Sequence, residues 1–422
     1  MIKHILKIVW NQRRANGWIF AELLVVVAVL WIMMDSLLVD TYTYCSPMGF
    51  DIEDVYRVNI GKMNPTTPGY TEDSLKQTSD GEDLIRLVDQ LRQSPQVSEA
   101  CLSFAGCPYT WSRSYSSLIQ AEADTSKKAD IFLRFTVSPS YFDVFRIKDN
   151  KGHPLRQIVE QNEGELVISA DMEQRFFEGQ SGTGRKVKWG SKDDASMAVT
   201  AVTGPIRQTE YDKSEPCFYT LLRTDKDVLE FIQDEKAQNM ECMVRMKDGF
   251  RSEDMEALLQ GMSDRLTVNN LYVSSVTPIK EFQEDMLKNR QDNMKKKLAL
   301  VGFMLVNVFF GIVGTFWLRT QYRQGEMGLR TALGSSRSQL RNFMDMEGLS
   351  LLAFTIPLVL IFIFNMLYFD MPDTARLPFT WWRLTIAFGG AVGMLAGMII
   401  VGIWFPARKV MKMNPADALH YE

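Results

Sequence analysis

One segment of this 422-residue chain has glycines at a spacing that could bind phosphate. Gly179 and Gly184 stand where a phosphate-binding loop has its two glycines, and the backbone N–H groups of such a loop surround nucleotide phosphates. In that loop a lysine directly follows the second glycine and a hydroxyl residue comes next, to reach phosphate and Mg²⁺. Arg185, Lys186 and Val187 occupy those places here. We therefore expect a hairpin or another strand-connecting loop at this point.

The remaining residue patterns do not indicate catalysis or metal binding. The sequence contains neither a nucleophile elbow nor an H-E-x-x-H motif. Acidic pairs such as Asp193 with Asp194 and Glu281 with Glu284 are typical of a solvated surface. The three histidines are scattered and C-x-x-C is absent, which argues against a zinc site. We expect no catalytic residue, no metal and no cofactor.

The cysteines all fall in one polar part of the chain. They are Cys45, Cys101, Cys107, Cys217 and Cys242. Cys101 and Cys107 are close enough in sequence to form a disulfide, but an odd count of five leaves at least one thiol free or intermolecular. Whether this pair is bridged stays open at this point.

Three uncharged apolar segments lie in the last third of the chain, at residues 298–318, 349–369 and 384–405. Each is long enough to cross roughly 30 Å of hydrocarbon as a helix. A fourth helix is expected at residues 17–39, although its apolar core is short. Glu22 would lie near its end, where a charge costs less and can face other helices. The alternative is a cleaved signal peptide, but no A-x-A cleavage site follows.

The distribution of positive charge predicts the orientation of these helices. Basic residues gather at the N-terminus, in the loop between Arg319 and Arg341, and in the tail from Arg408 to Lys412. With four spans all three segments lie on the cytoplasmic side, which is where lysine and arginine are retained. Residues 40–290 are then outside. The net charge of −4 gives no indication of a nucleic-acid partner.

The exterior segment alternates strand-like and helix-like patterns, which predicts a mixed α/β domain. Expected strands are 55–60, 131–137, 165–168, 198–202, 242–246 and 271–276, and expected helices are 83–92 and 252–262. Ser252 is the expected N-cap of the second helix. Residues 61–81, 109–117 and 180–190 are expected to be loops. Glu281 to Lys297 is predicted to run as a helix without a break into the second span.

Small residues and a proline stand out within the last two spans. Gly389, Gly393 and Gly397 recur every four residues, which predicts a flat strip for close helix packing. Pro357 removes a backbone donor and is expected to kink the third span.

The cytoplasmic loop at residues 323–337, RQGEMGLRTALGSSR, resembles a family signature close to R-x-x-E-I-G-[IL]-R-x-A-[LI]-G-A. This is the signature of the MacB/FtsX-like (type VII) ABC transporter permeases. Met327 stands in place of isoleucine and Ser335 in place of alanine. Residues 137–145, VSPSYFDVF, are similar to a stretch of the MacB periplasmic core domain, and residues 406–419 resemble the family's ending. The region from Gly61 to Asp130 matches no part of the family that we can specify.

The resemblance implies a membrane α-helical fold with four transmembrane helices and a large mixed α/β periplasmic domain inserted between helices 1 and 2. Expected domains are a cytoplasmic amphipathic helix (1–16), helix 1 (17–39), a MacB-like periplasmic core (40–290) and an FtsX-like permease domain (291–422). The protein would lie in the bacterial inner membrane, in contact with membrane lipid. It would lack a nucleotide-binding domain of its own.

The resemblance also implies partners. They are a separate cytoplasmic ABC ATPase, a second permease copy in a homodimer or heterodimer, and a periplasmic adaptor with an outer-membrane channel. Residues expected to contact the ATPase are Glu326, Met327, Gly328, Leu329 and Arg330. The implied function is efflux of peptides or drugs. Alternatives are FtsX/LolCE-like mechanotransmission to a cell-wall hydrolase, lipoprotein extraction, or, in a different class, a membrane-anchored sensor or adhesin.

Overall fold

The computed structural model describes residues 13–121, 129–190, 196–262, 265–322, 325–326, 329–330 and 333–410. Two compact units are present: residues 1–45 with 290–422, and residues 46–289. Most of the amphipathic helix expected at 1–16 lies outside the described residues. The two units are treated separately below.

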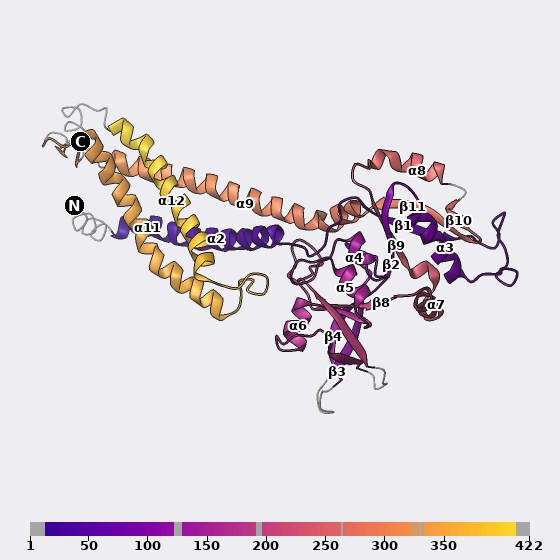
Figure 1. Ribbon diagram of the computed structural model, residues 1–422. Helices are drawn as coiled ribbons and strands as arrows, with labels where there is room; N and C mark the ends of the chain where they lie inside the picture. Colours follow the sequence, from indigo (N-terminus) through magenta and orange to yellow (C-terminus); the bar gives the residue numbers. More distant parts are fainter. Residues whose placement is uncertain are drawn as a thin grey trace. The chain divides into compact units, whose positions relative to one another are not determined.

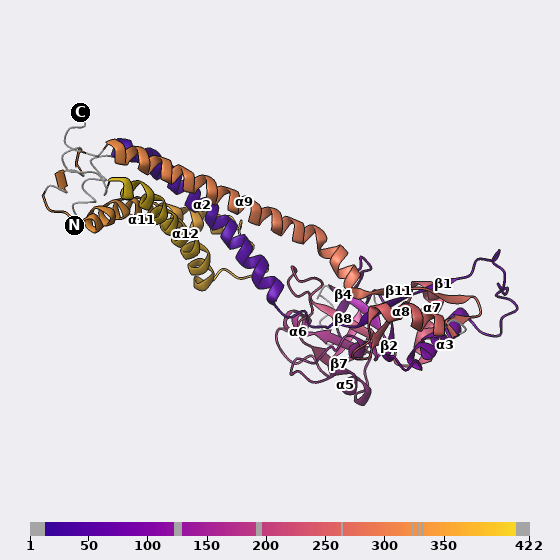
Figure 2. The ribbon, with the colours of Figure 1, turned by 90° about the horizontal axis from the view of Figure 1, so that it is seen from above.

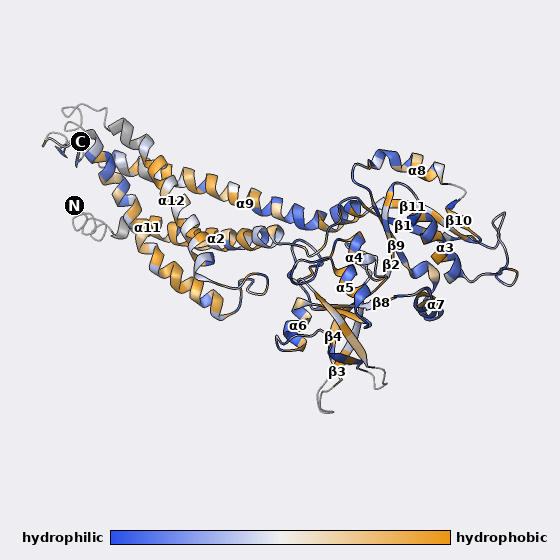
Figure 3. Ribbon diagram, in the orientation of Figure 1, coloured by the Kyte–Doolittle hydropathy of each residue, from blue (hydrophilic) through white to orange (hydrophobic). Residues whose placement is uncertain are grey.

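The first unit consists of long apolar helices, which can be followed in Figure 2. They are α2 (Arg13–Cys45), the later part of α9 (Ile279–Tyr322), α11 (Arg337–Tyr368) and α12 (Trp381–Val410). Each is long and apolar enough to cross a membrane. Hydropathy colouring shows that α9 is hydrophilic in its first turns and apolar in its later part (Figure 3). The helix expected from Glu281 into the second span is therefore confirmed.

The helices of this unit pack through stripes of apolar residues spaced by about one turn. On α12 the buried stripe is Ala387, Ala391, Leu395, Ile399 and Ile403. A Cβ atom on Gly311 of α9 would lie 2.8 Å from Oε1 of Glu22 on α2. Glu22 therefore faces another helix, as expected, and a side chain at position 311 would require the Glu22 carboxylate to move. Helix α11 continues through Pro357.

The second unit is built on a single sheet, most of whose strands are labelled in Figure 1. The strand order is β10-β11-β1-β9-β2-β4-β3-β6-β7-β5-β8. Strand bounds are β1 Val55–Lys62, β2 Val97–Phe104, β3 Ser114–Gln120, β4 Asp130–Val137, β5 Leu166–Ser169, β6 Lys186–Trp189, β7 Met197–Thr203, β8 Cys217–Leu221, β9 Glu241–Met246, β10 Thr267–Val268 and β11 Leu271–Pro278. The last strand, β8, also pairs with β4. Six strands, β4-β3-β6-β7-β5-β8, therefore close into a ring, and the other five form an open antiparallel sheet.

The ring and the open sheet form two lobes that share one core, in which Val55 and Met243 of the open sheet pack with Leu133 of the ring, and each lobe also has a core of its own. Helices of this unit are α3 Asp80–Arg92, α4 Tyr141–Val144, α5 Leu155–Gln161, α6 Ala170–Phe176, α7 Asp225–Asp234 and α8 Met255–Gly261. Along β8, Phe218 belongs to one core of the ring, while Cys217 and Tyr219 on the opposite face belong to another. The open sheet packs on α3 and α7 through residues such as Leu84 and Val228.

All six predicted strands and the helix at 83–92 are confirmed, but two expected loops were wrong in part. Residues 109–117 contain the start of β3, and residues 180–190 contain β6. Three serines interrupt the apolar pattern of β3, and β6 is only four residues long, so neither segment gives a clear strand pattern. Ser252 is not the N-cap of α8, because a 3₁₀ turn precedes the helix and the Ser252 hydroxyl lies 2.9 Å from the hydroxyl of Tyr56.

Candidate coupling site

The cytoplasmic segment before α11 is held by a well-defined helix start. Ser336 is the N-cap, its hydroxyl accepts from Gln339 N–H, and the Gln339 side chain accepts in return from Ser336 N–H. This capping box satisfies donors that a helix start otherwise leaves unpaired. Gly334 has φ of +93°, a conformation that favours glycine. The chain therefore turns sharply between the signature segment and α11.

Two residues of the signature pair with each other and rest on α11. Nη2 of Arg330 lies 2.9 Å from Oε1 of Glu326, one helical turn earlier. The guanidinium carbon lies 4.3 Å from the ring centroid of Phe343, which is buried. An arginine over an aromatic ring is attracted by the ring's negative face. Arg330 therefore connects the signature segment to the first turns of α11.

The same segment exposes two leucines. Leu329 is 52% exposed and Leu333 is 79% exposed, one turn apart in sequence. Met327 and Gly328 lie outside the described residues. Apolar side chains held on a frame of charged contacts are what a protein-recognition surface requires, because apolar anchors supply affinity and charges supply register.

A cluster of charges joins the helices of the first unit near the end of α2. Oδ2 of Asp40 lies 2.8 Å from Nζ of Lys297 on α9, and Oδ1 lies 2.7 Å from Nη1 of Arg376. Arg383 on α12 is fully buried and pairs with Asp35. Sequence reasoning missed this cluster. The sequence did contain an indication of these ion pairs. Two carboxylates, Asp35 and Asp40, follow the apolar core of the first span, and Arg376 and Arg383 flank the start of the last span.

In the second unit, one loop contacts both segments that lead toward the membrane helices. This loop, residues 204–216, connects β7 to β8. Nη1 of Arg207 donates to the carbonyl of Ser46 at 2.6 Å. Oε1 of Glu210 accepts from the Tyr109 hydroxyl at 2.6 Å and from Nε2 of Gln283, in the first turns of α9, at 2.5 Å. Arg207 and Glu210 are both buried. Loop 204–216 is therefore a shared attachment point for the two segments.

Comparison with known families decides the class of protein. Residues 298–415 match the family described as FtsX-like permease C-terminal. This part of the chain is an FtsX-like permease domain. The match covers the signature loop and three of the four apolar helices, and it confirms the resemblance to MacB/FtsX-like ABC transporter permeases. The permease is accordingly a multi-pass inner-membrane protein with its α/β unit in the periplasm.

Solved structures similar to the permease are periplasmic or extracellular domains. The periplasmic region of MacB from Actinobacillus actinomycetemcomitans is 16% identical, with 58% of this chain and 95% of that chain covered and a TM-score of 0.33. A domain of a putative permease protein from Porphyromonas gingivalis is 15% identical, with coverage of 54% and 92% and a TM-score of 0.33. The extracellular domain of the noncanonic ABC-type transporter YknZ from Gram-positive bacteria is 12% identical, with coverage of 52% and 100% and a TM-score of 0.30. No curated protein matches the chain.

The segment that imitates a phosphate loop connects α6 to β6 in the permease. The N–H of Gly182 donates to Oε1 of Glu173 at 2.7 Å, and the N–H of Gly184 donates to the carbonyl of Val199 at 2.8 Å. These donors are therefore already used by acceptors within the protein. Lys186 is exposed at the start of β6. The geometry agrees with a connecting loop.

The glycine strip on α12 faces away from the other helices of the chain. A Cβ atom added at Gly389, Gly393 or Gly397 would meet no described atom within 4 Å. The glycines that lie close to other helices are Gly390, near Met34, and Gly402, near Ile312. Close packing of another helix on the strip remains a prediction.

Four cysteines of the periplasmic unit lie in its interior. Cys101, Cys107, Cys217 and Cys242 are buried free thiols, so Cys101 and Cys107 are not bridged in this structure. Within the described ranges, no three metal-ligating side chains form a group that could hold an ion.

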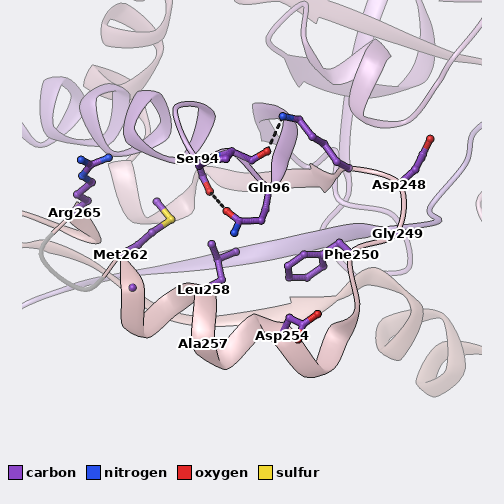
Figure 4. A pocket seen from close by; sticks show the side chains of 13 residues that line it. Ser94, Gln96, Asp248, Gly249, Phe250, Asp254, Ala257, Leu258, Met262 and Arg265 are labelled. Atoms are coloured by element: carbon purple, nitrogen blue, oxygen red, sulfur yellow. Dashed lines mark hydrogen bonds between the residues drawn. The ribbon is translucent and has the colours of Figure 1, made fainter.

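A groove of about 960 Å³ lies between α8 and the turn at residues 94–96 (Figure 4). Leu258, Met262 and Phe250 line one side of it, and Ser94 and Gln96 line the other.

Proposed function

We propose that this chain is the permease subunit of an ABC transporter that couples ATP hydrolysis by a separate cytoplasmic ATPase to movement of its periplasmic unit. The observation that carries the proposal is the signature segment, in which the Glu326–Arg330 pair and Phe343 form a frame beside the exposed Leu329 and Leu333. Glu326, Met327, Gly328, Leu329 and Arg330 are the proposed ATPase contacts. Their role is recognition without catalysis.

Helix α9 supports a mechanical form of coupling. It runs from Ile279, at the end of β11, to Tyr322, next to the signature segment. Its first turns are attached to the periplasmic unit through the buried Ile279, through Phe282 and Met286, which pack on the same core, and through the bond from Gln283 to Glu210. A continuous helix transmits displacement along its axis, which is a common way of linking distant sites. We propose that α9 carries motion from the ATPase to loop 204–216.

We further propose that two permease copies work together and that the output is efflux of peptides or drugs with a periplasmic adaptor and an outer-membrane channel. Gly389, Gly393 and Gly397 are the proposed packing strip, because their surface is open within the chain. Loss of efflux in a deletion strain would appear as increased sensitivity to a panel of drugs and peptides. Retained lipoproteins or defective cell-wall hydrolysis with unchanged sensitivity would identify the alternative outputs instead.

The test of coupling is co-purification of the ATPase with tagged permease from its native host, at matched expression. Replacing Leu329 by Asp should reduce ATPase recovery strongly, because an apolar anchor that the complex buries becomes charged. Leu75, which is 72% exposed in the other unit, gives the matched control Leu75→Asp. Exchanging the pair, Glu326→Arg with Arg330→Glu, keeps their mutual attraction but reverses both charges toward a partner. Gly328→Trp should block close approach. Full ATPase recovery and normal function in all three variants would place coupling elsewhere.

A further inference from the structure

The two lobes of the periplasmic unit are joined by a very short stretch of sheet. Strand β2 of the open sheet pairs with β4 of the ring only through Ser103 with Val137 and Phe104 with Thr136. A cavity of about 330 Å³ lies next to this joint, lined by Leu102 and Ser138 among others. That volume is within the range of ligand pockets, roughly 300–1,000 Å³, and such pockets favour boundaries between domains.

One wall of this joint cavity is aliphatic. It consists of Ile85, Val88, Leu102, Leu222 and Val228, from α3, β2, the end of β8 and α7. Val88 is 1% exposed, and Leu102, Leu222 and Val228 are each at most 6% exposed. These side chains therefore form a fixed wall against which an aliphatic group of a ligand can be removed from water.

A pair of buried serines leaves one donor unused in the same cavity. Ser138 and Ser140 are 8% and 5% exposed, and their hydroxyl oxygens lie 3.0 Å apart. Ser138 also accepts from the N–H of Leu102, and Ser140 also accepts from Nη2 of Arg92. Each hydroxyl has one hydrogen, and their mutual bond uses one of the two. Whichever serine donates, the other hydroxyl hydrogen has no acceptor among the described residues.

Arg156 contributes further unused donors. Its Nε and Nη1 donate to Glu160, Glu99 and Asp143, at 2.7, 2.9 and 2.9 Å. Nη2 makes no hydrogen bond to any described residue, so two N–H groups remain available. The site therefore presents donors from two sources, which suit a carbonyl oxygen.

The balance of charge in the lining limits what the ligand can be. Three arginines and three acids line the cavity: Arg92, Arg156, Arg223, Glu99, Glu160 and Asp225. A ligand with a net charge of either sign would lie close to charges that repel it. An uncharged amide has a carbonyl acceptor for Ser138, Ser140 and Arg156, and an N–H donor for a carboxylate.

We propose that the joint cavity binds a small uncharged molecule in which an amide carbonyl lies next to an aliphatic side chain, as in one unit of a peptide. The carbonyl accepts from the free serine hydroxyl and from Nη2 of Arg156. The side chain packs on Val88, Leu102 and Val228. Only the further step of calling such a ligand a transported substrate rests on the proposed function; binding itself requires neither ATPase nor transport.

The test uses full-length permease in lipid nanodiscs and N-acetyl-photo-leucine amide, whose diazirine labels what it contacts. Mass spectrometry should find label in α3 and in residues 221–228. N-acetyl-leucine amide should compete. N-acetylglycine amide, which lacks the aliphatic group, should not compete, and the charged N-acetyl-leucine and leucine amide should compete more weakly. Label spread over other regions, or equal competition by the glycine compound, would overturn the proposal.

Variants separate this site from adventitious labelling. Val228→Phe fills the aliphatic side and should abolish labelling of the cavity. Ser138→Ala with Ser140→Ala should weaken competition about three- to tenfold, the usual effect of losing one hydrogen bond. The control is Arg185→Met, which changes a half-buried arginine on the ring lobe that does not line the cavity, and it should leave labelling unchanged. Normal labelling in Val228→Phe would exclude the cavity, whereas failure of ATPase recruitment would leave this result unaffected.

Discussion

Nε and Nη2 of Arg383 donate to the two carboxylate oxygens of Asp35 at 2.8 and 2.6 Å, and the arginine is fully buried. Nη1 of Arg383 donates to the backbone carbonyls of Asp373 and Leu377. This arrangement joins α2 to α12 and to the turn that precedes α12. A buried ion pair offsets its desolvation only when geometry is good and most remaining donors are satisfied. Here the contact with the carboxylate is bidentate, and four of the five N–H groups of Arg383 have an acceptor.

Removing one member of this pair should destabilise the membrane unit strongly. We expect Arg383→Met to lower the free energy of unfolding by about 3–5 kcal/mol, because Asp35 is left buried without its partner. Arg383→Met combined with Asp35→Leu should recover most of the loss, since no charge then remains unpaired. Thermal unfolding in detergent measures both. Lys295→Met is the control, because Lys295 is exposed and its pairing with Asp292 is loose at 3.6 Å. Equal stability of the single and double variants would contradict the pairing argument.

A cluster of four charged side chains, called the charge ring below, holds residues 63–79 against the open sheet. Nζ of Lys62 lies 3.0 and 2.6 Å from Asp73 and Asp80, and Nζ of Lys76 lies 2.7 and 2.6 Å from the same two carboxylates. Hydrogen bonds from Lys76 and Lys62 lower the pKa of Asp73 to about 2. Burial opposes ionisation of Asp80, but the bonds from both lysines outweigh it and lower its pKa. Burial likewise opposes the charge on the lysines, and the bonds to the aspartates raise their pKa.

The pH dependence of the charge ring follows from these directions. The aspartates stabilise the folded state fully above their unfolded pKa, about 4, and this contribution is lost as the pH falls through their lowered folded values. The lysines contribute fully below about pH 10 and lose their contribution as the pH rises through their raised values. The protection factors for hydrogen exchange of residues 63–79 should be constant between these two pH limits. They should fall below the lower limit and above the upper one. Lys76→Met should show reduced protection at neutral pH, and an unchanged profile in that variant would argue against the charge ring.

Gln283 should matter for the attachment of α9 to loop 204–216. Replacing Gln283 by Leu removes a donor to the buried Glu210, whose other oxygen, Oε2, has no described partner. We expect the free energy of unfolding to fall by about 1–3 kcal/mol. The Gln283 amide replaces a water molecule that the buried carboxylate of Glu210 has lost, and the variant removes that donor. Hydrogen exchange at residues 279–287 should become faster. The control is Lys280→Leu, because Lys280 is exposed in the same helical turns and its replacement leaves the bond to Glu210 intact. Faster exchange of equal size in Lys280→Leu would assign the effect to helix propensity instead.

The thiols should differ sharply in reactivity. Burial raises the pKa of Cys217 and of Cys242 to about 12, and it also raises the pKa of Cys101 and Cys107. Since the thiolate is the reactive form, these four should resist maleimide until the protein unfolds. Cys45 is exposed and should label in the folded protein. Mass tagging before and after denaturation counts the thiols, and Cys45→Ser should remove the early label. Labelling of Cys101 in the folded state would contradict the buried core.

Much of this protein could be predicted from its sequence because the responsible signals are local. Apolar length determines which segments can span a membrane, and the positions of basic residues give their orientation. Alternating apolar residues identified strands such as β1, and Ser336 with Gln339 illustrates how a helix start is encoded over four residues. The signature around Glu326 and Arg330 identified the family because it is a continuous sequence.

Only the tertiary structure decided which distant residues meet. The bond from Arg383 to Asp35 spans 348 positions, and that from Glu210 to Gln283 spans 73. Pairing of β8 with β4 closes a ring that strand patterns do not reveal, because each strand alone fits an open sheet equally well. The joint cavity arises from α3, α5, α7 and the serine turn at 138–140, and no two of these are adjacent in sequence. Contacts of this kind depend on how whole elements pack, so periodicity and spacing along one segment cannot encode them.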